Sequence, residues 1–183
     1  MWSKQRRCGV ALVVLAAVVS VAWSAGKQTP PTAGAVAPDF TLMNQDDKPV
    51  RLGQYKGRWV VLYFYPADFS PGGMLQARNF ERDLAKYRQA NAVILGVSGN
   101  ATAKHRELIA KEGLHFELLS DAELQVSREY GSTMRDHTIH TMTYTARNTF
   151  LIDPSGKVAK VFVDVVPEHH SEEVLQALAT LQR

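Results

Sequence analysis

The fold is decided by the stretch Trp59-Val-Val-Leu-Tyr-Phe-Tyr-Pro-Ala-Asp-Phe-Ser-Pro-Gly-Gly73. Its first seven residues form a nearly continuous run of β-branched and aromatic side chains, which is typical of a central strand buried on both faces. After Gly73, apolar residues recur at three- and four-residue steps and predict the buried face of a helix; they are Ala77, Phe80, Leu84 and Tyr87. The stretch therefore predicts a central strand, a short loop and an amphipathic helix.

The rest of the chain alternates between strand and helix patterns. A small hairpin is predicted around residues 44–48, a second buried strand at 92–98 and a short strand at 116–119. Helices are predicted at 103–111, closing at Gly113, at 124–130, and after a capping Ser171. Residues 149–163 contain a Pro-x-Gly turn and predict another hairpin. These elements predict the α/β class, with a mixed β-sheet flanked by helices on both faces.

The first 24 residues have the composition of an export signal. Lys4, Arg6 and Arg7 precede a short apolar run, and small residues follow where a signal peptidase reads the chain. The run is shorter than the roughly 20 residues that span a bilayer. We therefore expect residues 1–24 to be a cleaved signal peptide and the protein to be periplasmic; an uncleaved N-terminal membrane anchor is the alternative. Residues 25–35 are predicted to be a flexible linker and 36–183 one domain.

Removal of the leader changes the charge and the thiol content. The chain has 21 basic and 18 acidic residues, and three of the basic ones lie in the leader, so the remainder has no net charge. This balance argues against a nucleic-acid partner. The single cysteine, Cys8, also lies in the leader. The exported chain is therefore expected to form no disulfide and to be stabilised by its hydrophobic core alone.

Five segments, at 36–42, 55–66, 91–98, 118–121 and 147–157, resemble the bacterioferritin comigratory branch of the peroxiredoxin family in content, order and spacing. The clearest are Val36-Ala-Pro-Asp-Phe-Thr-Leu and Arg147-Asn-Thr-Phe-Leu-Ile-Asp-Pro-Ser-Gly-Lys. Pro66 and Ser70 also match the family's active-site motif Pro-x-x-x-Thr/Ser-x-x-Cys. The resemblance implies a thioredoxin-like fold.

The same resemblance assigns the site residues. In the family, a cysteine in the first turn of a helix reduces the peroxide, while a hydroxyl and an arginine hold the peroxide oxygens. Ser70 matches the hydroxyl and Arg147 the arginine. Gly73 stands at the position of the peroxidatic cysteine, and Arg78 at that of the resolving cysteine found in many members of this branch. The thiolate is the nucleophile in this chemistry, and a glycine has none. The sequence therefore predicts a protein with the peroxiredoxin fold that does not reduce peroxides.

Other residues give weaker indications of chemistry. Met74 can be oxidised, but a methionine most often fills gaps in a core. His137, His140 and Met142 are possible copper ligands, yet the histidines stand in a predicted loop without a cysteine pair, so a solvated loop is the preferred interpretation. The same holds for His169-His170, predicted to lie in an exposed loop. We expect no metal and no cofactor.

Two functions follow from these observations. The first is a non-catalytic peroxiredoxin-like protein that binds a small anion or an unidentified protein partner. We expect the anion among Ser70, the amides near Gly73 and Arg147, with room where a cysteine sulfur would sit. Asp68 is a competitor for that place, and Asp136 or Asp153 are alternative partners for Arg147. The second function is a thioredoxin-dependent peroxiredoxin that reduces hydroperoxides.

Overall fold

The structure is a computed structural model that describes residues 29–135 and 142–183. Its centre is a seven-stranded mixed sheet in the order β2-β1-β5-β4-β3-β8-β9. The strands are β1 (Thr41–Asn44), β2 (Pro49–Arg51), β3 (Trp59–Phe64), β4 (Ala92–Ser98), β5 (Glu117–Ser120), β8 (Thr149–Ile152) and β9 (Val158–Phe162). β3 lies inside the sheet, parallel to β4 and antiparallel to β8, which confirms the predicted central strand.

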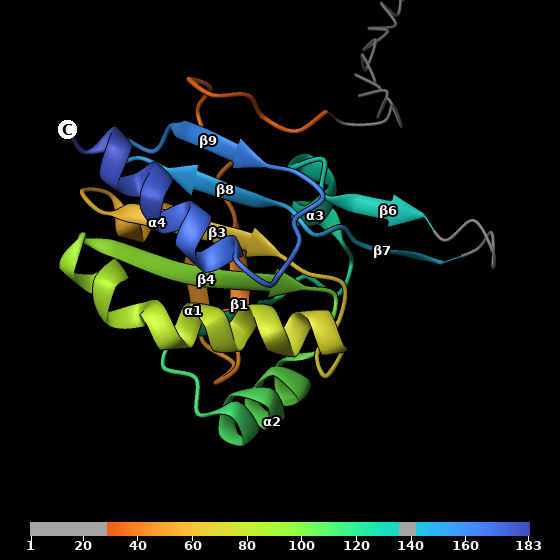
Figure 1. Cartoon of the computed structure of the whole chain (residues 1–183). Coiled ribbons are helices and arrows are strands. Elements are labelled where there is room, and N and C mark those ends of the chain that lie inside the picture. Colours follow the sequence, from red (N-terminus) through yellow and green to blue (C-terminus); the bar gives the residue numbers. More distant parts are fainter. Residues whose placement is uncertain (1–28, 136–141) are drawn as a thin grey trace, which may run out of the picture.

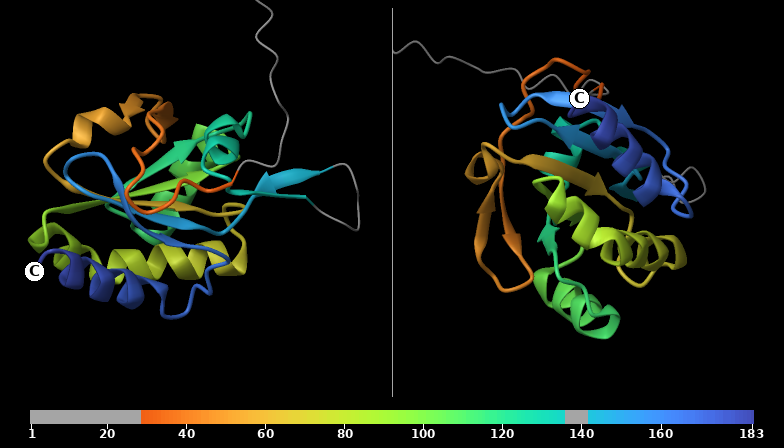
Figure 2. Two further views of the ribbon diagram at one scale, coloured as in Figure 1. Left: turned by 90° about the horizontal axis from the view of Figure 1, so that it is seen from above. Right: turned by 60° about the vertical axis from the view of Figure 1, so that its left-hand side comes forward.

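Helices cover both faces of this sheet (Figures 1 and 2). α1 (Pro71–Gln89), α2 (Thr102–Glu112) and α4 (His170–Leu181) lie on one face. The other face is covered by α3 (Gln125–Glu129), the 3₁₀ helix η1 (Leu52–Tyr55) and the segment before β1. The arrangement confirms the predicted mixed sheet flanked by helices. None of the helices in the described part of the chain is long and apolar enough to cross a membrane.

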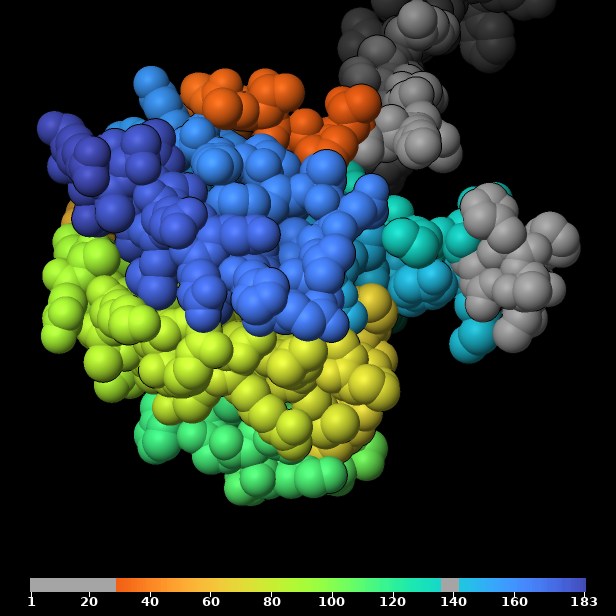
Figure 3. Space-filling model, viewed as in Figure 1, coloured from red at the N-terminus to blue at the C-terminus, as the bar shows by residue number. Residues whose placement is uncertain are grey.

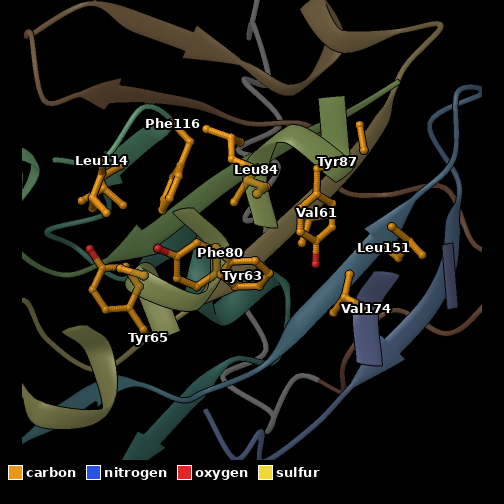
Figure 4. Packing of buried hydrophobic residues seen from close by; sticks show 14 of the residues in the cluster. Val61, Tyr63, Tyr65, Phe80, Leu84, Tyr87, Leu114, Phe116, Leu151 and Val174 are labelled. Atoms are coloured by element: carbon orange, nitrogen blue, oxygen red, sulfur yellow. The ribbon is translucent and has the colours of Figure 1, made fainter. Parts of the chain in front are cut away.

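The side chains in and just after β3 alternate between two hydrophobic cores. Those facing α1, α2 and α4 are Val61, Tyr63 and Tyr65, and those facing the opposite layer are Val60, Leu62 and Phe64. All six are at most 2% exposed. Phe80 of α1 packs beside Tyr63, with ring centroids 4.9 Å apart (Figure 4). This burial on both faces holds the end of β3, and the loop that follows it, in a fixed position.

α1 and α4 lie side by side at the surface (Figure 3) and are joined through Asp83. Its buried carboxylate accepts hydrogen bonds from Arg82 at 2.6 Å, Lys86 at 2.8 Å and the hydroxyl of Ser171 at 2.9 Å. Burial acts to raise the pKa of Asp83, but these hydrogen bonds outweigh it and hold the pKa at about 2. The carboxylate is therefore ionised at neutral pH and links the two helices. Ser171, predicted to cap α4, instead lies within its first turn; the cap residue is His169.

The region around residues 133–145 differs from the sequence prediction. Where a loop was predicted, β6 (Thr133–Arg135) and β7 (Thr143–Thr145) pair as a separate antiparallel ribbon that projects from the body (Figures 1 and 2). Strands of three residues are too short to show an alternating pattern in a sequence. His137 and His140 lie outside the described residues.

The prediction for His170 is wrong. It was expected to be exposed with His169, but its side chain is fully buried. Its Nε2 lies 2.9 Å from the Oγ1 of Thr149, and its ring packs edge-on against Phe162. Burial lowers the pKa of His170, which favours the neutral ring. These partners come from β8 and β9, so the local sequence around His170 gave no sign of them.

Candidate functional site

Hydrogen bonds of Ser70 hold the loop between β3 and α1 against the first turn of α1. Ser70 is the N-cap residue: its hydroxyl accepts a hydrogen bond from the amide of Gly73 at 3.1 Å and donates one to the carbonyl of Ala67 at 2.7 Å. Phe69, directly before it, has a left-handed backbone with φ at 57°, which is unfavourable for a residue with a Cβ atom. The hydroxyl assigned to ligand binding by the resemblance is thus already engaged within its own loop.

Gly73 is buried in the first turn of α1, next to this loop. A Cβ atom at this position would lie 2.6 Å from the carbonyl oxygen of Ala67 and 2.7 Å from the hydroxyl of Ser70, which is closer than real Cβ atoms approach other groups. The expectation that glycine leaves room for a ligand at the sulfur position is therefore wrong. The carbonyl and the hydroxyl take up the space that a side chain would need.

Arg147, in the segment before β8, reaches the same turn of α1. Its guanidinium donates to the Oε1 of Gln76 at 2.7 Å and to the carbonyl of Gly72 at 3.4 Å. It packs so closely on Gly72 that a Cβ atom there would lie 2.9 Å from one of its nitrogens. Burial lowers the pKa of Arg147, while Tyr63 and Glu168 act in the opposite direction. The structure thus places Ser70, Gly73 and Arg147 at one helix end.

Asp153, one of the two acidic residues considered as partners for Arg147, has other contacts. Asp153 accepts hydrogen bonds from the amides of Ser155 and Lys157, at 2.9 and 3.0 Å, in the turn between β8 and β9. Asp136 lies outside the described residues. Among the described residues, the hydrogen-bond acceptors of half-buried Arg147 are neutral oxygens, and no carboxylate is one of them.

Arg78 lies further along α1 and takes no part in this arrangement. Its side chain is mostly exposed and forms an ion pair with Glu112 at the end of α2, with a nitrogen–oxygen distance of 2.9 Å. Hydrogen bonding to Glu112 raises the pKa of Arg78. Arg78, predicted from the resemblance to stand at the resolving position, therefore joins two helices at the surface instead of facing the first turn of α1.

Sequence reasoning missed a cluster of buried polar side chains beneath the loop. Asp68 accepts a hydrogen bond from the hydroxyl of Tyr65 at 2.6 Å and lies 2.9 Å from the Nδ1 of His105 in α2. All three side chains are buried, and the Nε2 of His105 has no hydrogen-bond partner among the described residues. Asp68 therefore points into the protein and does not fill the position next to Ser70. The cluster ties the loop before α1 to α2.

Within residues 29–135 and 142–183, no three histidine, cysteine or acidic side chains are grouped as metal ligands would be. The polar groups at the start of α1 are a hydroxyl, backbone groups, an amide and a guanidinium. Such groups suit an oxyanion or a carboxylate better than a metal ion.

The sheet order, the flanking helices and the helix that begins just after β3 together define a thioredoxin-like fold of the peroxiredoxin type. The bacterioferritin comigratory protein of Xanthomonas campestris has this fold, with a TM-score of 0.78 and 29% identity over 83% of this chain and all of that one. Peroxidoxin BcpB from Mycobacterium tuberculosis gives a TM-score of 0.77 at 26% identity, over 84% of this chain and 99% of that one.

Sequence comparison leads to the family. Residues 33–161 match the model of the AhpC/TSA family, and the chain belongs to that family. It is 39% identical to the chloroplastic peroxiredoxin Q of Oryza sativa subsp. japonica, over 81% of this chain and 67% of the relative. It is also 37% identical to the chloroplastic peroxiredoxin Q of Sedum lineare, over 82% of this chain and 80% of the relative. The predicted resemblance to the peroxiredoxins is therefore confirmed.

Proposed function

We propose that this protein is an exported, non-catalytic member of the peroxiredoxin family that binds a small anion. The observation that carries the proposal is the state of the first turn of α1. The residue there is Gly73, and the carbonyl of Ala67 and the hydroxyl of Ser70 lie where its side chain would be. Peroxide reduction in this family needs a thiolate at that position, and a glycine cannot supply one.

The rest of the chain offers no replacement nucleophile of this kind. Residues 29–135 and 142–183 contain no cysteine, and Cys8 belongs to the predicted leader. A hydroxyl such as that of Ser70 cannot form the sulfenic acid through which a peroxiredoxin reduces its substrate. The fold supports the alternative function, a thioredoxin-dependent peroxiredoxin. The lack of a thiol in the domain argues against it.

Arg147 supports binding of an anion. Its guanidinium is half-buried, and its hydrogen-bond acceptors are neutral oxygens of Gln76 and Gly72. A partly buried positive charge next to a helix N-terminus favours a bound negative charge. Because the hydroxyl of Ser70 is engaged by Ala67, Arg147 is the main donor available to the ligand.

A peroxide-consumption assay tests the absence of catalysis. The full chain is mixed with thioredoxin, thioredoxin reductase and hydrogen peroxide, and loss of peroxide is followed over time. We expect no turnover above a control without the protein, and Cys8→Ser should behave in the same way. Sustained turnover by the Cys8→Ser variant would show that another residue performs the chemistry and would overturn the proposal.

Calorimetric titration with sulfate, phosphate and acetate tests the binding role. We expect saturable binding of at least one of these anions, weakened about tenfold or more by Arg147→Ala, because a hydrogen bond to a charged group contributes roughly 1.5–3 kcal/mol. Arg88→Ala is the matched control, since Arg88 also donates to a neutral carbonyl but lies on the surface. Equal binding by both variants, or none by the unmodified chain, contradicts the anion-binding role while leaving the assay result intact.

Export is proposed from the leader alone. Lys4, Arg6 and Arg7, followed by a short apolar run, support a cleaved signal peptide over a membrane anchor. N-terminal sequencing of the protein from producing cells is expected to begin near Ala25. A membrane-bound protein that still begins at Met1 would favour the anchor.

A further inference from the structure

A cavity lies at the opposite end of β3 from the start of α1. It has a volume of about 680 Å³ and is formed by residues 36–39, η1 and the turn between β8 and β9. Val60, near the beginning of β3, contributes to its lining, whereas Ser70 follows the end of that strand. Because a strand rises roughly 3.3 Å per residue, Val60 lies roughly 13 Å from Phe64 at the end of β3, before the loop that leads to Ser70. The cavity is thus distinct from the site around Arg147.

The floor of this cavity is apolar. Ala37, Leu52, Val60 and Ile152 line it, and each is at most 7% exposed. Its volume lies within the roughly 300–1,000 Å³ typical of small-molecule pockets. A ligand with a hydrocarbon body can therefore remove its own apolar surface from water here, which contributes roughly 25 cal/mol per Å² buried.

The rim carries both signs of charge, and its two carboxylates already accept hydrogen bonds. Asp39 accepts hydrogen bonds from Arg51 at 3.1 Å and from the amide of Gly53 at 3.2 Å. Asp153 is held by Ser155 and Lys157, as described above.

Two rim cations lack such partners. Lys56 and Arg58 line the cavity, and neither forms an ion pair with a described residue. Arg58 is partly buried, whereas Lys56 is exposed. The rim therefore presents two positive charges that form no ion pair with a described residue, beside an apolar floor.

We propose that this cavity binds a small monoanion with an apolar body, of the class of medium-chain carboxylates. The carboxylate is held by Arg58 and Lys56, and the hydrocarbon chain lies on Leu52, Val60 and Ile152. A planar guanidinium and a carboxylate match as paired donors and acceptors. An anion without an apolar body would contact only Arg58 and Lys56. An uncharged hydrocarbon chain would contact only the apolar floor.

Calorimetric titration of the full chain with octanoate, octan-1-ol and inorganic phosphate tests this site. We expect octanoate to bind at least tenfold more tightly than either of the others. The double variant Lys56→Gln/Arg58→Gln should weaken octanoate binding about tenfold or more, because each charge-assisted hydrogen bond is worth more than one factor of ten. Lys48→Gln, which removes an exposed cation of the turn between β1 and β2, should leave the affinity unchanged.

An NMR titration places the ligand. Octanoate should shift the backbone amide signals of Gly53, Lys56 and Ser155, and Arg147→Ala should not change these shifts. Shifts confined to the start of α1, or affinity that the double variant leaves unchanged, would overturn the proposal. Because Arg147 is not part of this cavity, failure here leaves the anion-binding role of Arg147 to its own test.

Discussion

Asp68→Ala is expected to lower the free energy of unfolding by about 3–5 kcal/mol, the cost of removing one partner from a buried charged or hydrogen-bonded group. The carboxylate accepts from the hydroxyl of Tyr65 at 2.6 Å and lies 2.9 Å from the Nδ1 of His105. Both partners are at most 1% exposed, so water cannot replace the lost acceptor without opening the core. Each donor left unpaired in the interior costs roughly 1–3 kcal/mol.

The effect should be local as well as global. Asp68 connects the loop before α1 to α2, and its own amide donates to Asn100 at 2.9 Å. Its loss is expected to speed hydrogen exchange of the amides in residues 66–73 beyond the change elsewhere in the chain. Such a result would identify the cluster as the support that positions the loop.

Urea denaturation of the full chain measures the loss of stability. Asp46→Ala serves as the matched control, because Asp46 is an exposed aspartate whose carboxylate accepts one long hydrogen bond, from Gln45 at 3.3 Å. It should change the stability by less than about 0.5 kcal/mol. Asp68→Asn keeps one acceptor oxygen and should lie between the two. If Asp68→Ala proved as mild as Asp46→Ala, the buried cluster would have no role in stability.

Most of the fold could be predicted because its signals are local. The apolar run at Trp59–Phe64, the helical stripe after Gly73 and the C-cap at Gly113 each lie within one element, and the structure confirms all three. Gly113 has the left-handed backbone, with φ at 64°, that makes glycine favourable after a helix. The ribbon of β6 and β7 was missed because its strands are too short to show a period.

The candidate site was only partly accessible to such reasoning. The family motif placed Ser70, Gly73 and Arg147 together, but it could not tell that the Ser70 hydroxyl turns back to Ala67 or that Arg78 pairs with Glu112. The cluster of Asp68 and His105 joins residues 37 positions apart. A polar residue in the loop after a buried strand and a histidine on a following helix were the available signals. Neither signal predicted the contact between Asp68 and His105, because that contact depends on the tertiary fold.

The substitution Gly73→Cys is expected to destabilise the protein and, at the same time, to create a reactive thiol. A Cβ atom at this position would meet the carbonyl of Ala67 at 2.6 Å and the hydroxyl of Ser70 at 2.7 Å, so the loop must move. Overpacking of this kind costs about 1–3 kcal/mol. In thermal denaturation, Gly73→Ala should show the same loss, whereas Gly53→Ala should be nearly neutral, since a Cβ atom there meets nothing closer than 3.8 Å.

The new thiol tests whether the surroundings of the site still favour a thiolate. It would lie in the first turn of a 19-residue helix, close to the guanidinium of Arg147. A helix N-terminus and a neighbouring positive charge both lower the pKa of a thiol below its usual value of about 8.5. We therefore expect, in a Cys8→Ser background, a lowered thiol pKa and a faster reaction with hydrogen peroxide than free cysteine shows. Adding Arg147→Ala should slow that reaction. A thiol with an unshifted pKa and the rate of free cysteine would show that the surroundings of residue 73 do not activate a thiol.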